Sequence, residues 1–267
     1  MISFDEIKSF FADSLRRNPS YFEYMLKEYF HYRMLDIMFS WENASKLSFI
    51  GGTSLRILYQ TQRFSEDLDF DCFNLSRDEF ISLTDKVIDR LRQEGIKVEA
   101  EDKHKDLRLT AFRRNITFPG LMFDLGLTGH PEKKLLIKIE CEPHHYHYEP
   151  IKPIIQKFNV FTQIFTPSAG ILLSMKTGAV LERGKGRDYY DFMFLSGLTD
   201  PDFGYLNAKF GIANHAELYE RILQSCDQID FQTKSLDFAK LVLDPAETRK
   251  VMLFKGYIKQ KASRSNT

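Results

Sequence analysis

Two aspartates form the pair of residues in this 267-residue chain whose type and spacing most clearly suggest chemistry. Asp67 and Asp69 lie in a run that alternates acidic and apolar residues, Glu66-Asp67-Leu68-Asp69-Phe70. Side chains two positions apart on a strand project from the same face, so both carboxylates would lie about 6–7 Å apart at the backbone. One divalent ion could reach both. Mg²⁺ prefers carboxylate and phosphate oxygens, so the pair predicts a metal–phosphate site.

A glycine turn precedes the two aspartates. Gly51 and Gly52 follow the apolar run 47–50, which is typical of a strand, and precede a predicted helix over residues 53–60. Backbone N–H groups at such a turn can bind phosphate, and the hydroxyls of Thr53 and Ser54 add donors. Gly-Gly alone usually marks a turn, and Asp-x-Asp alone usually marks a solvated strand edge. The combination in this order favours a site for a nucleoside triphosphate and its metal.

A third carboxylate follows on a later predicted strand, residues 135–141. Glu140 alternates there with Lys138, while Ile137 and Ile139 occupy the other face. If this strand pairs beside the strand over 67–73, Glu140 could join the metal site or act as a base. The alternative is an ordinary exposed glutamate.

A basic motif stands in the second half of the chain. Lys176 lies on a predicted helix over residues 168–183, and the run Arg183-Gly184-Lys185-Gly186-Arg187-Asp188 follows it. The glycines are expected to break that helix and leave Lys185 and Arg187 on a flexible turn. Asp188 is expected to cap the next helix, and Arg187 could pair with Asp191 four residues later. The alternative is a solvated charged turn between two helices.

The elements that must position these residues are predicted from periodicity and caps. The first 40 residues are expected to be helical, with Asn18-Pro19 opening a helix to about Ser40. Ser76 and Glu79 form a capping box that opens a helix to about residue 94. Further strands are predicted over 96–100, 107–114 and 121–127, and further helices over 188–195, 216–226 and 246–260. The chain therefore divides near residue 160 into domains 1–160 and 161–267, the second of them helical.

In this order the motifs resemble those of the AbiEii/AbiGii nucleotidyltransferase toxins, a group of the polymerase-β-like superfamily. The matching runs are Gly-Gly-Thr-Ser-Leu-Arg, Arg-Phe-Ser-Glu-Asp-Leu-Asp-Phe, and a lysine followed by Arg-x-Lys-x-Arg-Asp-x-x-Asp, within residues 47–196. The resemblance implies an α+β fold in which a minimal nucleotidyltransferase core with a mixed sheet and flanking helices precedes a helical half. The implied catalytic residues are Asp67, Asp69, Lys176 and Asp191, and the implied metal ligands are Asp67, Asp69 and Glu140. The implied nucleotide-binding residues are Gly51, Gly52, Thr53, Ser54, Arg63, Ser65, Arg183, Lys185 and Arg187.

The same resemblance implies an enzyme that uses Mg²⁺ or Mn²⁺. It would transfer a nucleotide from a nucleoside triphosphate to an acceptor hydroxyl and release pyrophosphate, as the toxin of a type IV toxin–antitoxin or phage-defence system. A cognate antitoxin encoded nearby is then an expected partner, and tRNA is the preferred acceptor. The alternatives are a protein or small-molecule acceptor, or a nucleotide-binding module without turnover.

The amino-acid composition excludes several other classes of protein. Lys plus Arg and Asp plus Glu each number 37, and 43% of residues are hydrophobic, which excludes a disordered chain and a bulk cationic nucleic-acid wrapper. No apolar run approaches the roughly 18 residues of a membrane span. An acidic N-terminus without a signal pattern and three scattered cysteines predict a cytoplasmic protein. Two basic stretches, 103–114 and the residues after Glu247, could face a nucleic-acid backbone or simply be solvated.

Overall fold

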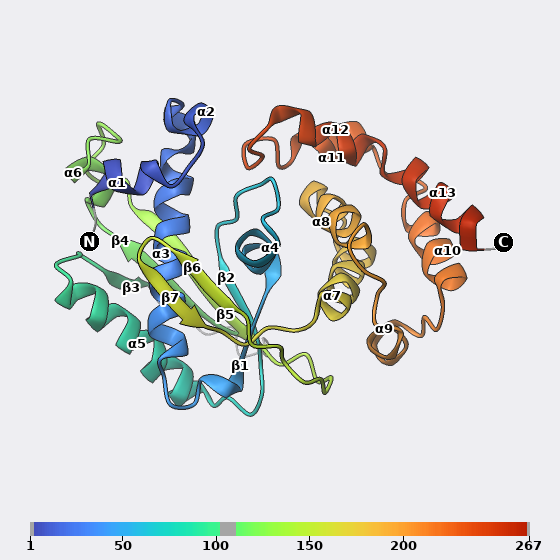
Figure 1. The fold of residues 1–267 in the computed structure, drawn as a ribbon, viewed down its shortest axis with the longest axis horizontal. Helices are drawn as coiled ribbons and strands as arrows, with labels where there is room; N and C mark the ends of the chain where they lie inside the picture. The colour runs from blue at the N-terminus through green and yellow to red at the C-terminus, as the bar shows by residue number, and fades with distance from the viewer. Residues whose placement is uncertain (1–2, 102–110, 266–267) are drawn as a thin grey trace. The chain divides into compact units, whose positions relative to one another are not determined.

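The computed structural model describes residues 3–101 and 111–265 and divides the chain into two compact units (Figure 1). Unit 1 comprises Met1–Tyr59, Phe64–His145 and Pro150–Thr166, and unit 2 comprises Gln60–Arg63, Tyr146–Glu149 and Pro167–Thr267. The predicted α+β class with a mixed sheet is confirmed. The short segment 60–63 belongs to unit 2 although the residues on both sides of it belong to unit 1.

Unit 1 is built on a five-stranded sheet with the order β1-β2-β5-β4-β3. Its strands are β1 (Leu47–Ile50), β2 (Leu68–Cys72), β3 (Glu99–Glu101), β4 (Phe112–Phe118) and β5 (Leu135–Glu142). β2 and β5 are parallel, and the other neighbours are antiparallel. The helices of unit 1 are α1 (Phe4–Ser9), α2 (Asp13–Arg16), η1 (Pro19–Tyr21), α3 (Phe22–Phe39), η2 (Ala44–Lys46), α4 (Gly51–Tyr59), α5 (Arg77–Gln93) and α6 (Leu121–Asp124). The pairing of β2 with β5 is the arrangement on which the prediction for Glu140 depended.

The two central strands alternate between a buried and a polar face. Leu68 and Phe70 of β2, with Ile137 and Ile139 of β5, are almost completely buried. Residues between them on each strand therefore point to the opposite face of the sheet. This alternation fixes the register of the acidic residues, because a slip of one position would turn the apolar set out of the core.

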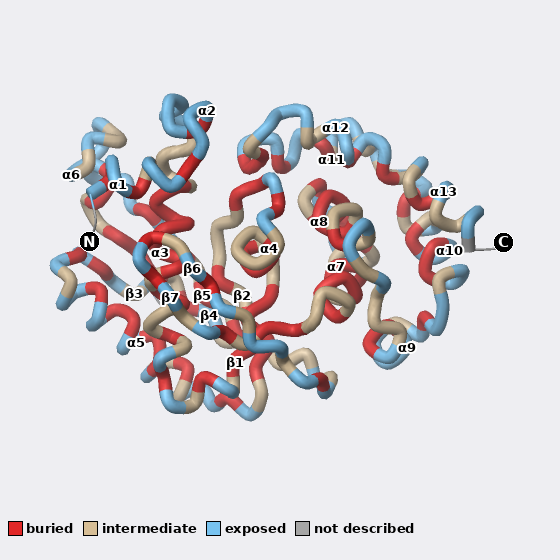
Figure 2. The backbone as a smooth tube through the Cα atoms, in the orientation of Figure 1, coloured by how far each residue is buried: buried red, intermediate tan, exposed pale blue. Residues whose placement is uncertain are grey.

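Helix α3 is surrounded by protein along most of its length (Figure 2). It packs against α5, α1 and β7 (Val160–Gln163). Strand β7 forms a hairpin with β6 (Ile154–Lys157), and Figure 1 draws this hairpin beside α3. Asn18 accepts a hydrogen bond at the start of η1, immediately before α3, as predicted. Burial on nearly every side explains why the sequence of α3 shows no single apolar stripe.

Three predicted strands differ from the observed elements. Residues 121–127 were expected to be a strand, but Leu121–Asp124 form helix α6, because Gly120 turns the chain with a φ of +70° just before it. A short apolar run cannot be assigned to strand or helix from periodicity alone. The strand expected over 107–114 is observed as β4 from Phe112, with residues 102–110 outside the described part, and the strand expected over 96–100 is observed as β3.

The β6–β7 hairpin was not predicted. Its two-residue turn uses Phe158 at φ +53° and Asn159 at φ +64°. Turns of this type usually carry Asn-Gly or Asp-Gly, so Phe-Asn sends no recognisable signal from the sequence.

Within the residues that the structure describes, the regular secondary structure of unit 2 is helical, apart from the bridge between Arg63 and Val242. Its helices are α7 (Ala169–Glu182), α8 (Gly186–Ser196), α9 (Phe203–Phe210), α10 (His215–Ser225), α11 (Phe231–Leu236), η3 (Pro245–Glu247), α12 (Thr248–Met252) and α13 (Phe254–Ser265). α7 packs on α8, α10 on α13, and α11 on α12. The helix expected over 246–260 is divided among η3, α12 and α13, because Leu253 closes α12 with a hydrogen bond to Lys250 three residues back.

Segment 60–63 is anchored in unit 2 by backbone contacts. Arg63 forms an antiparallel bridge with Val242, and the N–H of Leu243 donates to the carbonyl of Gln62 at 3.0 Å. Arg63 is thus fixed next to the helices of unit 2.

Within the described ranges, no helix has the length and apolar character that crossing a membrane requires.

Candidate active site

The turn from β1 into α4 lies directly against Asp69. Gly51 is the first residue of α4 and has a φ of +80°. A Cβ atom at this position would lie 2.3 Å from Oδ2 of Asp69 and 2.9 Å from its Cβ. Only glycine therefore fits. The arrangement brings a carboxylate to the N-terminal end of α4, where unpaired N–H groups and the helix dipole favour negative charge.

Asp67 and Asp69 lie on the polar side of the sheet. Asp69 is within β2, where its register partners are Ile50 of β1 and Glu140 of β5. Asp67 comes one residue before β2, and its side chain is 33% exposed. The buried Leu68 between them points to the core. Both carboxylates consequently share a face, in the arrangement that the strand alternation predicts.

Glu140 lies beside Asp69 and is held by two cations. Arg113 of β4 donates to both of its carboxylate oxygens, at 2.7 and 3.1 Å. Lys138 is 3.0 Å from Glu140 and 3.7 Å from Asp67. Partial burial raises the pKa of Glu140, but these cations outweigh burial and leave the pKa below its usual range. Glu140 is therefore ionised and a poor proton acceptor. It belongs to a row of alternating charges formed by Asp67, Lys138, Glu140 and Arg113.

The hydroxyls of the glycine turn are already bonded within unit 1. Thr53 donates to the carbonyl of Asp67, and Ser54 donates to the carbonyl of Gly51 at 2.9 Å. Both residues are buried, whereas Gly52 is half-buried at the second position of α4. Ser65 is half-buried before β2, and no hydrogen bond of its side chain is found among the described residues. The two bonded hydroxyls fix backbone segments here, which differs from the nucleotide contact expected for them.

In unit 2 a buried ion network joins three of the predicted residues. Arg63 donates from Nε and Nη2 to the two oxygens of Asp191, each at 2.7 Å. Lys176 of α7 lies 2.7 Å from Oδ2 of the same carboxylate on α8. Burial raises the pKa of Asp191, but the two cations outweigh it and lower the pKa to about 2. Asp191 is thus ionised and pairs with Arg63 and Lys176, and not with Arg187, the partner that its spacing in the sequence allowed.

The basic turn is tightly packed at both of its glycines. Gly184 has a φ of +51°, and a Cβ there would lie 2.5 Å from the hydroxyl of Tyr189. A Cβ on Gly186 would lie 1.9 Å from the carbonyl oxygen of Lys234. Arg187 belongs to α8. The break between the two helices is therefore present as predicted and is closely packed, but Arg187 lies in α8 and not on the turn.

Asp188 caps α8 as predicted. Its Oδ2 accepts from the N–H of Lys185 at 3.1 Å, and its two oxygens accept from Arg183 at 2.8 and 2.7 Å. Lys185 is exposed and Arg187 is half-buried. In the described part of the chain, no ion pair is found for either of these two side chains. They are therefore the members of the basic motif most available to a phosphate.

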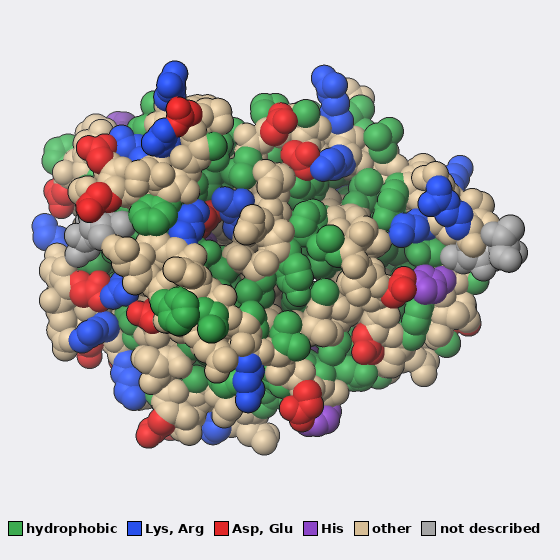
Figure 3. Space-filling view, viewed as in Figure 1, with side chains coloured by type: hydrophobic (Ala, Val, Ile, Leu, Met, Phe, Trp, Pro, Cys, Tyr) green, Lys and Arg blue, Asp and Glu red, His purple; other side chains and the backbone are tan. Residues whose placement is uncertain are grey.

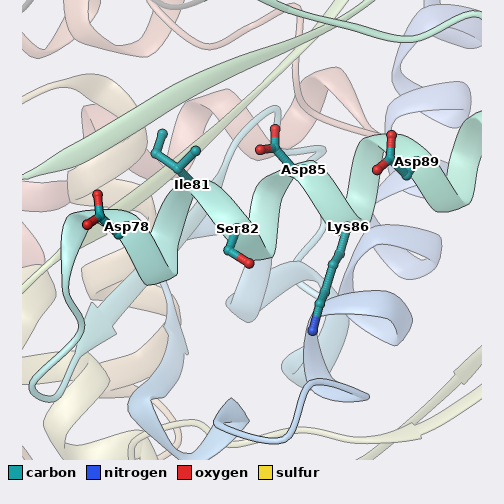
Figure 4. A pocket seen from close by; sticks show the side chains of 6 residues that line it. All are labelled: Asp78, Ile81, Ser82, Asp85, Lys86 and Asp89. Atoms are coloured by element: carbon teal, nitrogen blue, oxygen red, sulfur yellow. The ribbon is translucent and has the colours of Figure 1, made fainter.

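A hollow on the outer side of α5 is acidic. It is lined by Asp78, Asp85 and Asp89, with Lys86 and two uncharged residues, Ile81 and Ser82 (Figure 4). Asp85 is paired with Arg114, Asp89 lies 3.6 Å from Arg92, and among the lining residues three carboxylates accompany a single cation, Lys86. This hollow is therefore unsuited to the nucleotide, in contrast to the turn at Gly51.

Sequence reasoning missed Arg113 as a partner of Glu140. The pairing depends on the register of β4 against β5, which places Arg113 opposite Glu140. Charge alternation within each strand is visible in the sequence, but the register between them is not. Lys138 could be seen to share a face with Glu140, yet its approach to Asp67 required the β2–β5 pairing.

A mixed sheet that carries paired aspartates beside a glycine turn is the arrangement expected of a nucleotidyltransferase core. A family model described as the nucleotidyl transferase AbiEii toxin of a type IV toxin–antitoxin system matches residues 37–253. The chain belongs to this family of nucleotidyltransferase toxins. A comparison with curated proteins finds no significant match.

Two solved structures are similar to this chain at low sequence identity. The nucleotidyltransferase toxin MenT4 from Mycobacterium tuberculosis H37Rv aligns with a TM-score of 0.61 at 14% identity, over 98% of this chain and 94% of that chain. JHP933 from Helicobacter pylori aligns with a TM-score of 0.49 at 17% identity, over 91% and 94% of the two chains. The MenT4 likeness supports the fold, while the family rests on the sequence model.

Replacing Gly51 with alanine tests the contact with Asp69. Gly95 is the matched control, because its φ is +81° and no atom lies within 4 Å of the position of an added Cβ. Both substitutions should cost about 1–2 kcal/mol for the left-handed backbone. Gly51→Ala should cost more and abolish nucleotide transfer, whereas Gly95→Ala should retain it. Urea unfolding and a transfer assay measure both effects, and equal activity of the two variants would contradict the proposed contact.

The Asp191 network predicts a pH dependence of stability. A carboxyl with a folded pKa of about 2, against its ordinary 3.8, stabilises the fold above about pH 4. That contribution is lost as the pH falls from 4 toward 2. Asp191→Asn should remove it and lower the unfolding free energy at pH 7 by about 3–5 kcal/mol, because buried Arg63 and Lys176 lose their partner.

The control for this measurement is Lys255→Met, which breaks an exposed pair with Asp227 and should cost at most about 1 kcal/mol. Unfolding curves at pH 7 and pH 3 compare the variants with the parent chain. An Asp191→Asn variant whose stability and pH dependence match those of the parent would show that the network does not stabilise unit 2.

Proposed function

We propose that this nucleotidyltransferase uses Mg²⁺ or Mn²⁺ to transfer a nucleotide from a nucleoside triphosphate to an RNA acceptor, with tRNA as the preferred class. The observation that carries the proposal is the geometry of unit 1. Two carboxylates, Asp67 and Asp69, share one face of the sheet, and the second is packed against the glycine that opens α4. A helix N-terminus and a carboxylate pair at one place suit a metal–triphosphate complex.

The donor set fits a hard divalent ion held jointly with phosphate. In the described residues, no three His, Cys, Asp or Glu side chains are grouped to hold a metal ion. Mg²⁺ in proteins is commonly bound by only one or two carboxylates together with substrate phosphates and water. Asp67 and Asp69 would supply those carboxylates. Glu140, which is paired with Arg113, would keep the neighbouring charged side chains in order and add a negative charge beside the two aspartates.

Lys185 and Arg187 are proposed as the phosphate contacts of the basic motif, because their charges are not paired within the described residues. Lys176 is a third candidate. Its ammonium carries three donors, and Asp191 accepts one of them at 2.7 Å. Asp191 and Arg63, both fully buried, would then act by orienting Lys176 and have no direct contact with the nucleotide. Arg183 would serve the Asp188 cap.

In the proposed reaction the acceptor hydroxyl attacks the α-phosphorus in line. A new oxygen–phosphorus bond forms, the bond between the α-phosphorus and the oxygen that bridges to the β-phosphorus breaks, pyrophosphate leaves, and the hydroxyl proton passes to solvent. The bound divalent ions would supply charge neutralisation and a lower pKa of the attacking hydroxyl. The residues of this chain would orient the triphosphate: Asp67 and Asp69 through the ions, and the N–H groups of Gly51 and Gly52 through its phosphate oxygens.

An RNA acceptor is supported by the distribution of charge in unit 2. After Glu247 the chain has six Lys or Arg residues and no acid. On the face drawn in Figure 3, the Lys and Arg side chains of unit 2 lie mostly over α11, α12 and α13. Such a surface suits a phosphate backbone. The proposal also includes an antitoxin partner, which the type IV toxin–antitoxin family implies, and a cytoplasmic location.

The proposal is tested by supplying each α-labelled nucleoside triphosphate with RNA, protein and metabolite extracts. Label is expected in RNA of tRNA size. Asp67→Asn and Asp69→Asn should each lower the rate at least about 100-fold, which corresponds to about 2.7 kcal/mol. Asp89→Asn, on the exposed side of α5, should leave the rate unchanged.

The other outcomes each reject part of the proposal. Label in protein or in a metabolite would replace the RNA acceptor while retaining the chemistry. Nucleotide binding without any labelled product would indicate a binding module. Full activity of Asp69→Asn would contradict the assignment of the site to unit 1.

A further inference from the structure

Asp67 lies just outside the hydrogen-bonded strands of the sheet. It precedes the first residue of β2, and the register pairs of that strand begin at Leu68. The carboxylate nonetheless has to keep one position relative to Asp69 for the two to share an ion. Whatever fixes the backbone at residues 66 and 67 therefore fixes half of the proposed metal site.

Two consecutive carbonyl groups at this point accept hydrogen bonds from buried side chains. The carbonyl of Asp67 accepts from Thr53 of α4. The carbonyl of Glu66 lies 3.2 Å from Nε2 of His31 on α3. A carbonyl oxygen can only accept, so Nε2 of His31 carries the proton in this pair. Burial lowers the pKa of His31 to about 4, which keeps the ring neutral at pH 7.

The side chain of Glu66 is held from the same helix. Lys27 lies one turn before His31 on α3, and its ammonium donates to Oε1 of Glu66 at 3.1 Å. Lys27 is 8% exposed and Glu66 is 28% exposed, so this pair is largely shielded from water and from salt screening. Helix α3 thus forms hydrogen bonds with both the backbone carbonyl and the side-chain carboxylate of Glu66, the residue that precedes Asp67.

We propose that His31 and Lys27 are positioning residues for Asp67, acting through Glu66, with Thr53 as the matching support from α4. The inference rests on the proposed function, since it assigns a purpose to the Asp67 carboxylate. It gives α3 a part in the site beyond packing. It also explains why Lys27, His31 and Thr53, which are polar, are buried around a segment without strand pairing.

The first experiment measures Mn²⁺ binding by electron paramagnetic resonance, in the full-length chain with a non-hydrolysable triphosphate, so no turnover is needed. His31→Leu removes the donor while retaining an apolar side chain. The Mn²⁺ dissociation constant should rise about 10-fold, the low end of effects seen when a supporting residue of a metal ligand is lost. His31→Gln, whose amide can donate to the same carbonyl, should restore most of the affinity. Lys27→Met should give a smaller rise.

The control separates positioning from general stability. Val87→Ala creates a cavity under α5 at a fully buried position and should lower the unfolding free energy by about 1–3 kcal/mol, without changing Mn²⁺ affinity. Hydrogen exchange of the peptide covering residues 64–70 should accelerate in His31→Leu and not in Val87→Ala. Thr53→Val should behave as His31→Leu does, whereas Thr53→Ser should retain affinity.

Two failures are distinguishable. If the parent chain binds no Mn²⁺ and Asp69→Asn changes nothing, the proposed function fails. If the parent chain binds Mn²⁺ through Asp69, but His31→Leu binds it as tightly as the parent, the positioning role of α3 is wrong and the proposed function stands.

Discussion

The contact between Gly51 and Asp69 is the constraint on which unit 1 depends. The register of β1 and β2 sets Ile50 opposite Asp69, so the residue that follows Ile50 must pass over that carboxylate. Any side chain at Gly51 would enter the space of Asp69. The position of the carboxylate, the left-handed turn and the first turn of α4 are thus consequences of one close approach. The buried Leu68 and Phe70 of β2 then fix the face of the sheet on which Asp69 lies.

Buried charge is the second recurring feature, and each instance links distant segments. In unit 2, Asp191 holds Arg63, which is 128 positions away in the sequence, and Lys176 on the neighbouring helix. In unit 1, Glu28 of α3 pairs with Arg56 of α4 and with Lys157 of the hairpin. Such networks add little net stability compared with apolar packing, but loss of one partner is costly. They therefore favour one arrangement of helices over others.

A net charge of zero conceals this organisation. The polar side of the sheet alternates acids with Lys138 and Arg113. On the face drawn in Figure 3, the Lys and Arg side chains of unit 2 lie mostly over α11, α12 and α13. Charge balance over the whole chain reflects pairing within each unit more than an absence of charged surfaces. A local phosphate-binding surface is compatible with it.

Local patterns in the sequence predicted those features of the structure that depend on interactions between residues close together in the chain. The alternation around Asp67 and Asp69 gave their shared face, and the capping residues Ser76 and Asp188 were identified from spacing alone. The family followed from motifs in order. These features depend on neighbours within a few residues.

Features that depend on long-range packing were not predictable in the same way. Thr53 was expected to contact a nucleotide, and its hydroxyl is found to donate to the carbonyl of Asp67, fourteen residues later in the chain. Arg63 was expected at the nucleotide, but segment 60–63 belongs to unit 2 and buries it on Asp191. Such outcomes require the tertiary register, which one sequence does not contain.

The most direct test of the account is the location of the metal. Crystals grown with Mn²⁺ and a non-hydrolysable nucleoside triphosphate would show the ion by anomalous scattering. The account predicts a peak at coordination distance, about 2.0–2.3 Å, from carboxylate oxygens of both Asp67 and Asp69, with phosphate oxygens completing its shell. A triphosphate bound with its ion elsewhere, or with neither aspartate coordinating, would contradict it.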